Sequence, residues 1–240
     1  MKKLLIDPKG KKTLVEDAEE LHTSRGVIKN PKNGPVKTHL GTTYYLTDPT
    51  IVDYVDKMPK AAQIIYPKDA AMIIGLTGLS NGSKVVEAGV GVAGLTTLLA
   101  NSIQPKGKVY SYEIREDHIK KAKENLESCG LLKYVDIKNR SIYDGIDEEN
   151  VDVVILDLPE PWLAIEPALR ALRVGGFLVS YSPSIEQTKK FATALTPHFP
   201  EANTMEVLVR DWEVSKQRCR PKTRMIAHTG FITIARKLTE

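Results

Sequence analysis

The sequence predicts an α/β protein with a mostly parallel sheet, a C-terminal antiparallel hairpin and a small β-rich domain in front. Short apolar runs between Pro- and Gly-containing turns fill residues 1–58, which is typical of a β meander. Strand-like and helix-like segments then alternate, and this favours a parallel sheet covered by helices. Residues 151–156 are almost entirely apolar, like a central strand buried on both faces. We therefore expect one domain at residues 1–58 and a second at residues 59–240.

The composition is that of an ordinary globular protein, with 42% hydrophobic and 27% charged residues. A chain of 240 residues can bury a sizeable core without cross-links. Apolar runs stay well short of the ~20 residues that cross a bilayer, and the apolar stretch near the N-terminus is too short for a signal peptide. We expect a cytoplasmic protein.

The cysteines and histidines do not suggest a metal site. Cys129 and Cys219 lack the spacing of metal ligands or of a redox pair, and the five histidines are scattered. We therefore expect no metal. Two reduced thiols are the simplest interpretation, and a disulfide between subunits through Cys219 is left open.

The elements before the glycine-rich loop follow from turn and cap residues. A short helix should begin at Asp48-Pro49 and end near Met58. Pro67 suits the first turn of a helix that we expect to reach Thr77. Residues 85–88 then form a strand that runs into the loop.

The loop at residues 89–94 has the pattern G-x-G-x-x-G, formed by Gly89, Gly91 and Gly94. Glycines allow a sharp turn and a close approach of the backbone to a ligand, so the pattern predicts a cofactor cradle. A helix should begin near Leu95. A second strand then delivers Glu113, at a spacing that suits a carboxylate accepting hydrogen bonds from a ribose diol. The alternative is a structural corner without a ligand.

Glu87 indicates which cofactor the loop would hold, because it stands two residues before the first glycine. A pyrophosphate seated on the helix N-terminus would be repelled by a nearby carboxylate. S-adenosylmethionine (SAM) has no phosphate and carries a sulfonium cation. The acid therefore favours SAM over a dinucleotide.

The elements after Glu113 continue the alternation of strands and helices. A helix should begin at Asp117, and a helix beginning at the capping-box residue Ser184 should stop before Pro197. The remaining expected elements are a strand over Val151–Leu156, a helix through Leu172, a turn at Gly175-Gly176, a strand over Phe177–Tyr181, and a terminal hairpin of Met205–Val214 with Gly230–Arg236. This antiparallel finish favours a methyltransferase sheet over a dinucleotide-binding one.

Asp157 ends the strand over residues 151–156 and is followed by Pro159, Pro161 and Trp162. Ligands of open α/β sheets lie beyond the carboxyl ends of the strands. An acid followed by prolines and an aromatic residue resembles the D/N-P-P-Y/F/W signature of enzymes that methylate nitrogen atoms. The alternative is that Asp157 only caps the following helix.

Five motifs occur along the chain in the order QIIYPKDAA, VVEAGVGVAGLT, KVYSYEIRED, NVDVVILDLPEPW and RMIAHTGFITIARKL, and the match runs from about residue 38 onward. Together they resemble the tRNA adenine N1-methyltransferase family that modifies the T-loop, in its archaeal form. The resemblance implies a Rossmann-like class I SAM-dependent methyltransferase, a small N-terminal β domain and a homotetramer. It also implies methylation of adenine 58, with adenine 57 a second target in archaeal members.

Site residues are carried over from the family onto this chain. The residues expected to be catalytic are Asp157 and Tyr66: Asp157 would face both the methyl donor and the target adenine, and Tyr66 would line the base pocket. The residues expected to hold SAM are Glu87, Gly89, Gly91, Val92, Ala93, Gly94, Leu95, Glu113, His118, Ser141 and Asp157. Those expected to hold the substrate are Tyr66, Trp162, Arg218, Arg220, Lys222, Arg224 and His228.

This chain departs from the family pattern at two positions of the cofactor site. Val92-Ala93 stands where the family commonly has Ser-Gly, and Ser141 stands where many relatives have an acid. The first departure removes a hydroxyl contact to SAM. The second removes an acceptor for the amine of the cofactor's adenine.

Charge distribution suggests a phosphate-rich partner. The net charge of +4 is small, but residues 1–40 hold nine Lys and Arg against five acids, and residues 210–224 hold six against two. Two basic stretches that flank a neutral core fit tRNA. Three alternatives stay open: a SAM-dependent enzyme acting on a small molecule, a nicotinamide-dependent reductase, and a non-catalytic tRNA-binding subunit.

Overall fold

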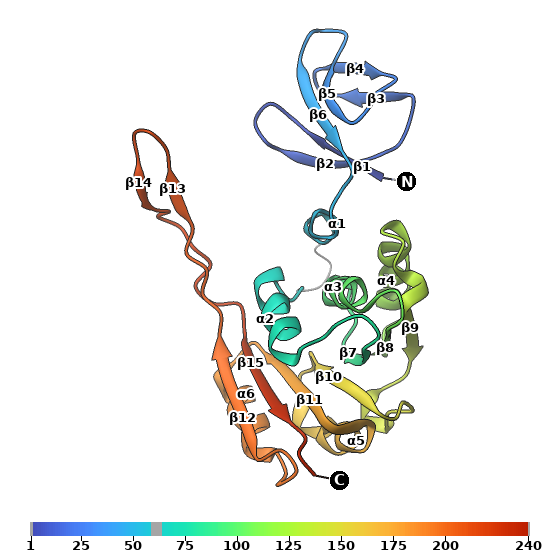
Figure 1. Ribbon diagram of the computed structural model, residues 1–240, viewed down its shortest axis with the longest axis vertical. Coiled ribbons are helices and arrows are strands. Elements are labelled where there is room, and N and C mark those ends of the chain that lie inside the picture. The colour runs from blue at the N-terminus through green and yellow to red at the C-terminus, as the bar shows by residue number, and fades with distance from the viewer. Residues whose placement is uncertain (1, 59–63, 240) are drawn as a thin grey trace.

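The computed structural model describes residues 2–58 and 64–239. Figure 1 shows small β sheets at the N-terminal end and a layered α/β part below them. The expected domain boundary at residue 59 lies outside the described residues, so the division into two domains stays a prediction. No helix in the described ranges is long and apolar enough to span a membrane.

The N-terminal region is built from short antiparallel strands. A four-stranded sheet has the order β2-β1-β6-β5, and β3 pairs with β4 in a hairpin. A small core that includes Leu5, Ile28 and Leu46 is buried between them. The strands are β1 (Lys2–Ile6), β2 (Lys12–Glu16), β3 (Glu20–Thr23), β4 (Gly26–Lys29), β5 (Gly34–Lys37) and β6 (Thr43–Thr47).

Helix α1 (Ile51–Lys57) follows β6 and begins slightly later than expected. The Thr50 side chain accepts a hydrogen bond from the Asp53 backbone, and the Asp53 carboxylate accepts one from the Thr50 backbone. This capping box sets the start of the helix at Ile51 and not at Asp48-Pro49. Met58 is the C-cap, as expected.

The central sheet has seven strands in the order β12-β15-β11-β10-β7-β8-β9. Strands β7 to β11 are parallel to one another, whereas β15 is antiparallel to both β11 and β12. The predicted fold class is therefore confirmed. The strands are β7 (Lys84–Ala88), β8 (Lys108–Glu113), β9 (Val135–Asn139), β10 (Val151–Leu156), β11 (Leu172–Ser182), β12 (Glu201–Glu206) and β15 (Phe231–Arg236).

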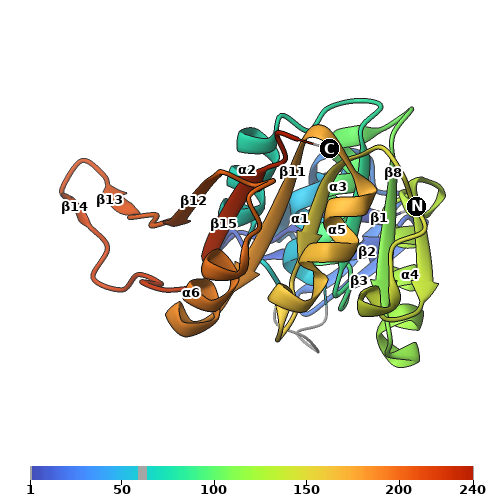
Figure 2. The ribbon, with the colours of Figure 1, turned by 90° about the horizontal axis from the view of Figure 1, so that it is seen from below.

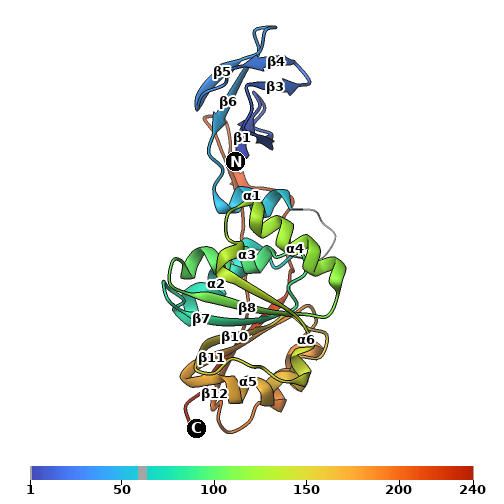
Figure 3. The ribbon, with the colours of Figure 1, turned by 90° about the vertical axis from the view of Figure 1, so that its right-hand side faces the viewer.

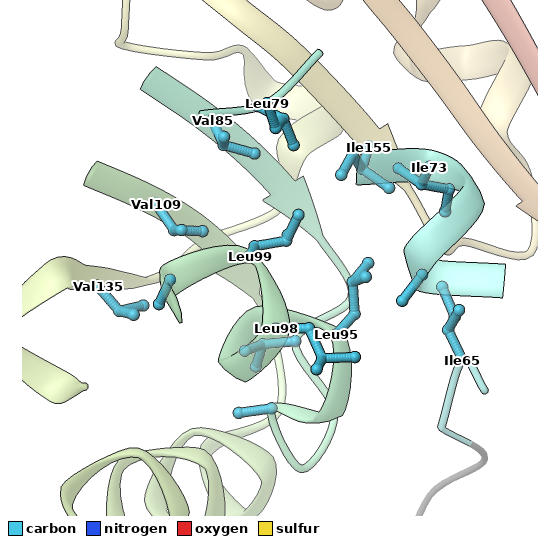
Figure 4. Packing of buried hydrophobic residues seen from close by; sticks show 14 of the residues in the cluster. Ile65, Ile73, Leu79, Val85, Leu95, Leu98, Leu99, Val109, Val135 and Ile155 are labelled. Atoms are coloured by element: carbon cyan, nitrogen blue, oxygen red, sulfur yellow. The ribbon is translucent and has the colours of Figure 1, made fainter. Parts of the chain in front are cut away.

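Helices cover both faces of this sheet, with α2, α3 and α4 on one side and α5 and α6 on the other (Figure 3). Alternate strand residues serve the two sides: Val85 packs toward α3 with Leu99 (Figure 4), and its neighbour Val86 belongs to the opposite core. The helices are α2 (Pro67–Thr77), α3 (Gly94–Ile103), α4 (Glu116–Ser128), α5 (Ile165–Ala171) and α6 (Ile185–Ala194), with short 3₁₀ turns η1 (Leu132–Tyr134), η2 (Ile142–Asp144) and η3 (Pro161–Ala164).

The region around Gly175-Gly176 differs from the prediction of a turn between a helix and a strand. Helix α5 ends at Ala171, and Leu172 already pairs with Val151 in β11. The pairing then shifts, so that Val153 lies opposite Phe177. The two glycines therefore form a bulge inside β11. Gly175 has φ +82°, which explains why a glycine stands there.

The C-terminal hairpin also differs from the prediction. Residues 205–214 are not one strand, because β12 ends at Glu206 and β13 (Trp212–Val214) is a separate strand that pairs with β14 (Cys219–Pro221). Residues 207–230, here called the arm, leave the sheet between β12 and β15 and project away from the body (Figure 2). The expected basic loop is thus a hairpin at the tip of the arm. Both cysteines are free thiols, with Cys219 exposed in this tip.

Candidate active site

Strand β7 ends where the glycine loop begins, and two of the loop's glycines are required by neighbouring protein segments. A Cβ on Gly89 would lie 2.3 Å from the carbonyl oxygen of Asp157. A Cβ on Gly94 would lie 1.7 Å from Cγ2 of Ile64. The glycine pattern predicts close approach of a ligand, but at these two positions the approaching atoms belong to the chain itself. Gly91 borders the cavity described next, with φ +51°.

A cavity of about 280 Å³ opens at the carboxyl ends of β7, β8 and β10. A second cavity of about 130 Å³ adjoins it, and Gly89, Glu113 and Leu158 border both. The larger cavity is lined by Ile64, Ile65, Glu87, Gly89, Val90, Gly91, Val92, Gly94, Leu95, Glu113, Ile114, Arg115, His118, Asp157, Leu158 and Pro159. Two joined hollows of this size suit a small-molecule ligand.

Glu113 ends β8 at the junction of the two cavities. One carboxylate oxygen accepts hydrogen bonds from the backbone N–H groups of Ile114 (2.9 Å) and Arg115 (3.0 Å). The other accepts a longer bond from the Gly91 N–H (3.3 Å) and lies 3.4 Å from Nδ1 of His118. Glu113 thus ties its own strand end to the glycine loop, and a ligand sugar at this junction would meet its carboxylate.

Glu87 borders the larger cavity but is only 1% exposed. One of its carboxyl oxygens accepts hydrogen bonds from the hydroxyl groups of Thr96 (2.7 Å) and Ser111 (2.9 Å). Burial raises the pKa of Glu87 to about 7, against the effect of these two donors. Thr96 of α3 and Ser111 of β8 therefore hold the Glu87 carboxyl group in place. Sequence reasoning did not foresee these two contacts.

Asp157 follows the last residue of β10, and its backbone N–H donates to the carbonyl of Ala88 (3.0 Å). Burial raises the pKa of the Asp157 carboxyl to about 7. The next helical turn, η3, begins at Pro161, and its N-cap is Glu160. The interpretation of Asp157 as a mere helix cap is therefore wrong. Asp157 lines the larger cavity together with Glu87 and Glu113.

The remaining residues of the expected cofactor site take different places. Val92 and Leu95 line the larger cavity. Ala93 is the N-cap of α3, fully buried in the left-handed conformation with φ +67°, where the family commonly has glycine. Ser141 borders the smaller cavity, and its hydroxyl accepts a hydrogen bond from the Tyr143 N–H (3.2 Å).

Three of the residues expected to hold the substrate do not line either of these two cavities. Tyr66 is the N-cap of α2 and is 40% exposed. Trp162 is half-buried in η3, with the Lys190 ammonium 3.8 Å from its ring centroid. His228 contacts Glu206 and the carbonyl of Pro183 at the base of the arm. The structure thus gives Trp162 and His228 intramolecular partners.

The basic residues of the arm lie at its tip, away from the strand ends that form the cavity (Figures 1 and 2). Arg218 and Arg220 both pair with Glu213, at 3.2 and 3.3 Å. Lys222 pairs with Asp211 at 3.2 Å. Arg224 is exposed as well. Because these pairs are exposed, they cost little to break in favour of phosphate groups.

Several lining residues were missed by sequence reasoning. Ile64 and Ile65 line the larger cavity, and Ile64 lies against Gly94 of the glycine loop. Arg115 and Pro159 also line this cavity. Arg115 and Pro159 could have been found because each stands two residues after a strand-end acid. Ile64 and Ile65 come from a distant segment, and only their position just before Tyr66-Pro67 hinted at a role.

A family model described as the tRNA methyltransferase complex GCD14 subunit matches residues 42–229. The chain belongs to this tRNA methyltransferase family. Because the chain belongs to this family, the glycine loop is explained without a nicotinamide-dependent reductase. It also agrees with the acid before the loop and with the antiparallel strand β15.

Relatives of the tRNA methyltransferase family match almost the whole chain. The tRNA (adenine(57)-N(1)/adenine(58)-N(1))-methyltransferase TrmI of Methanocaldococcus jannaschii is 38% identical, covering 98% of this chain and 94% of the relative. The tRNA (adenine(58)-N(1))-methyltransferase TrmI of Thermus thermophilus is 34% identical, covering 98% and 96%.

Two solved structures share the whole fold. A SAM-dependent O-methyltransferase from Thermotoga maritima has a TM-score of 0.91 at 32% identity, covering 100% of this chain and 93% of its own. The tRNA (m1A58) methyltransferase TrmI from Aquifex aeolicus has a TM-score of 0.86 at 27% identity, covering 100% and 98%.

Proposed function

We propose that this protein transfers a methyl group from SAM to N1 of an adenine in the T-loop of tRNA, at position 58. The Thermus relative is named for position 58 and the Methanocaldococcus relative for positions 57 and 58. Adenine 57 is therefore proposed as a second target. The observation that carries the proposal is that three acidic residues, Glu87, Glu113 and Asp157, line one cavity.

The shape and charge of the two cavities support SAM as the cofactor. The smaller cavity, bordered by Ile114, Ile142 and Tyr143, offers apolar walls for an adenine ring. Glu113 stands at the junction, where a ribose would lie. The larger cavity offers Asp157 to the sulfonium, whose positive charge would favour the ionised carboxylate. SAM supplies an electrophilic methyl group in this arrangement.

The reaction needs alignment more than proton transfer. Adenine N1 has an in-plane lone pair that can attack a methyl group directly, so catalysis can consist mainly of orientation in a dry pocket. The methylated base is cationic. Asp157 would accept a hydrogen bond from the adenine amino group and stabilise this charge as it develops.

Recognition of the substrate requires the adenine to leave its stacked position, because base edges are inaccessible in a folded T-loop. Enzymes that act on bases flip the nucleotide into the active site. Tyr66, exposed at the start of α2, is proposed to stack on the flipped adenine. Trp162 is less suited, because Lys190 lies over its ring. The arm is proposed to hold the phosphate backbone.

The proposal is tested by incubating the protein with labelled SAM and an unmodified tRNA transcript, followed by mapping of the methylated nucleosides. We expect 1-methyladenosine at position 58, and its loss in a transcript with guanine at that position. A transcript with guanine at position 57 decides whether the second target is used. Absence of base methylation in every transcript would overturn the proposal.

One observation favours a second candidate function. The Thermotoga maritima structure, with a TM-score of 0.91, is described as an O-methyltransferase. If this chain methylated a hydroxyl group, the same mapping would find methylated ribose or no RNA product. A small-molecule substrate would, however, leave the basic arm without a role.

We further propose a cytoplasmic homotetramer. Five large apolar side chains of the arm, Leu208, Val209, Trp212, Val214 and Ile226, are each more than half exposed. Apolar groups gathered on a projecting hairpin are typical of a surface that a partner covers. Light scattering of the purified protein should give four times the chain mass of 26.6 kDa.

A further inference from the structure

Lys68 has no part in the chemistry proposed above, yet all three of its donors are used. Its ammonium group donates to Oδ1 of Asp69, to the carbonyl of Val207 and to the hydroxyl of Thr229, each at 2.7 Å. An ammonium group has three donors and no acceptor. Only 18% of the Lys68 side chain is exposed. Each N–H donor of the Lys68 ammonium group therefore has an acceptor, which indicates that this side chain is fixed in place.

Asp69 completes the junction from the other side. Its side chain is fully buried, in the first turn of α2. Oδ1 accepts from Lys68, and Oδ2 accepts from the Thr229 hydroxyl at 2.8 Å. The Tyr181 hydroxyl lies 3.5 Å from Oδ2. A buried carboxylate is tolerated only when it is paired in this way. We call Lys68, Asp69, Thr229 and the Val207 carbonyl the clasp.

The clasp binds both segments of the arm where they leave the sheet. Val207 follows the last residue of β12, and Thr229 stands two residues before β15. The partners of both are on the first turn of α2, which also presents Tyr66 as its N-cap. The base of the arm is therefore tied to the element that carries the proposed base-stacking residue.

The arm is long enough for a small change at its base to matter at its tip. Val207 lies eight residues before Ser215, where the turn of the tip hairpin begins, and this corresponds to at most about 26 Å at ~3.3 Å per residue. A tilt of about 10° at the base would move the tip by about 5 Å, as follows from that length. The basic tip would then hold tRNA in a different position relative to the cavity.

We propose that Lys68 and Asp69 are positioning residues: the clasp fixes the direction of the arm relative to the active-site cavity. This inference rests on the proposed function, because the object positioned is the bound tRNA. Phosphates held at the tip and the adenine held near Tyr66 then share one rigid frame. A misplacement of about 1 Å can cost as much as ~10² in rate, so the frame affects turnover on tRNA.

The first test measures the arm itself and needs no substrate. A nitroxide label on the exposed native Cys219 and a second label on Glu127→Cys in α4, in a Cys129→Ser background, report the distance between arm tip and body. Labelled chains are diluted with unlabelled protein, so that only distances within one chain contribute. We expect a narrow distance distribution in the parent, a broad one in Lys68→Met, and a narrow one again in Lys68→Arg.

The second test measures catalysis on tRNA. Lys68→Met should lower kcat/KM for tRNA by about 10²-fold, whereas the dissociation constant of SAM should stay within twofold of wild type. Lys68→Arg should restore most of the loss. Lys84→Met is the matched control, because Lys84 donates to the Glu149 carbonyl at the start of β7, whereas the arm leaves at the carboxyl end of the parallel strands; it should behave as wild type.

The two tests separate the clasp from the proposed function and from simple loss of stability. If Lys68→Met does not fold, the double variant Lys68→Met/Asp69→Asn removes both charges together and takes its place. An unchanged distance distribution, or an unchanged kcat/KM for tRNA, in the folded variant would overturn the inference. If the wild type methylates no tRNA, the proposed function is overturned. The distance distribution alone then tests whether the clasp fixes the direction of the arm.

Discussion

The rim of the active-site cavity and the tip of the arm both gather charged side chains, but they hold them in opposite ways. Glu87 and Glu113 are almost fully buried and are fixed by hydroxyl and backbone donors. Arg218 and Arg220 are more than half exposed and share Glu213. The carboxylates that line the cavity are therefore fixed on buried strand ends, whereas the exposed arginines of the arm tip stay free to exchange partners.

The largest expected effect comes from removing the charge of Asp157. Both Asp157→Asn and Asp157→Ala should lower the single-turnover rate on unmodified tRNA by ~10²–10³, because the developing cation then has one preorganised electrostatic partner fewer. Affinity for tRNA should persist, since phosphate contacts dominate it. Glu160→Gln, at an exposed acid three residues away, is the control. Rates near wild type in both Asp157 variants would move the catalytic assignment elsewhere.

A second prediction tests the packing of the glycine loop. Gly94→Ala should lower the free energy of unfolding by about 1–3 kcal/mol, because the new Cβ overlaps Ile64. Gly75→Ala is the matched control: it lies exposed in α2 with no atom within 4 Å of the new Cβ. This change should stabilise the protein by about 0.5–1 kcal/mol. Chemical denaturation measures both free energies of unfolding. If Gly94→Ala is as stable as Gly75→Ala, Ile64 can move aside without loss of stability.

A third prediction concerns the tip of the arm. Replacing Arg218, Arg220, Lys222 or Arg224 singly by Gln should weaken binding to all tRNAs alike and flatten the salt dependence by about 0.9 in slope for each phosphate group that is no longer neutralised. Glu213→Gln should have the opposite effect on affinity, because it releases two arginines. Salt titrations of tRNA binding distinguish these outcomes. If the salt dependence of tRNA binding is unchanged in these variants, the tip does not bind phosphate groups and would instead contact another subunit.

A fourth prediction is a dependence of stability on pH. Burial raises the pKa values of Asp157 and Glu87 to about 7, well above those of unfolded chains. The folded state therefore binds protons more tightly, and this contribution is full below about pH 4 and is lost as pH rises through about 7. The Tm of the ligand-free protein should fall between about pH 5 and about pH 8, by less in Asp157→Asn. Each kcal/mol corresponds to about 2–4 °C here.

The difference between the two regions also explains what the sequence could predict. Strand ends, the glycine pattern and Asp157 follow from local rules, since parallel strands place their carboxyl ends at one edge. The contacts of Lys68 with residues 207 and 229 join parts of the chain that lie more than 130 residues apart. Local patterns carry no signal for such pairs, and the split of residues 205–214 into two strands was missed for the same reason.

The position of β15 has a consequence for how the protein folds. This strand comes last in chain order among the described elements, yet it lies inside the sheet between β11 and β12. On the ribosome, the edge of β11 must stay unpaired until residues 231–236 have emerged, and unpaired edges are prone to aggregate. A nonsense mutation before residue 231 would remove an interior strand and leave β12 without its partner. We therefore expect such truncated chains to be degraded or insoluble even though every residue that lines the cavity is present.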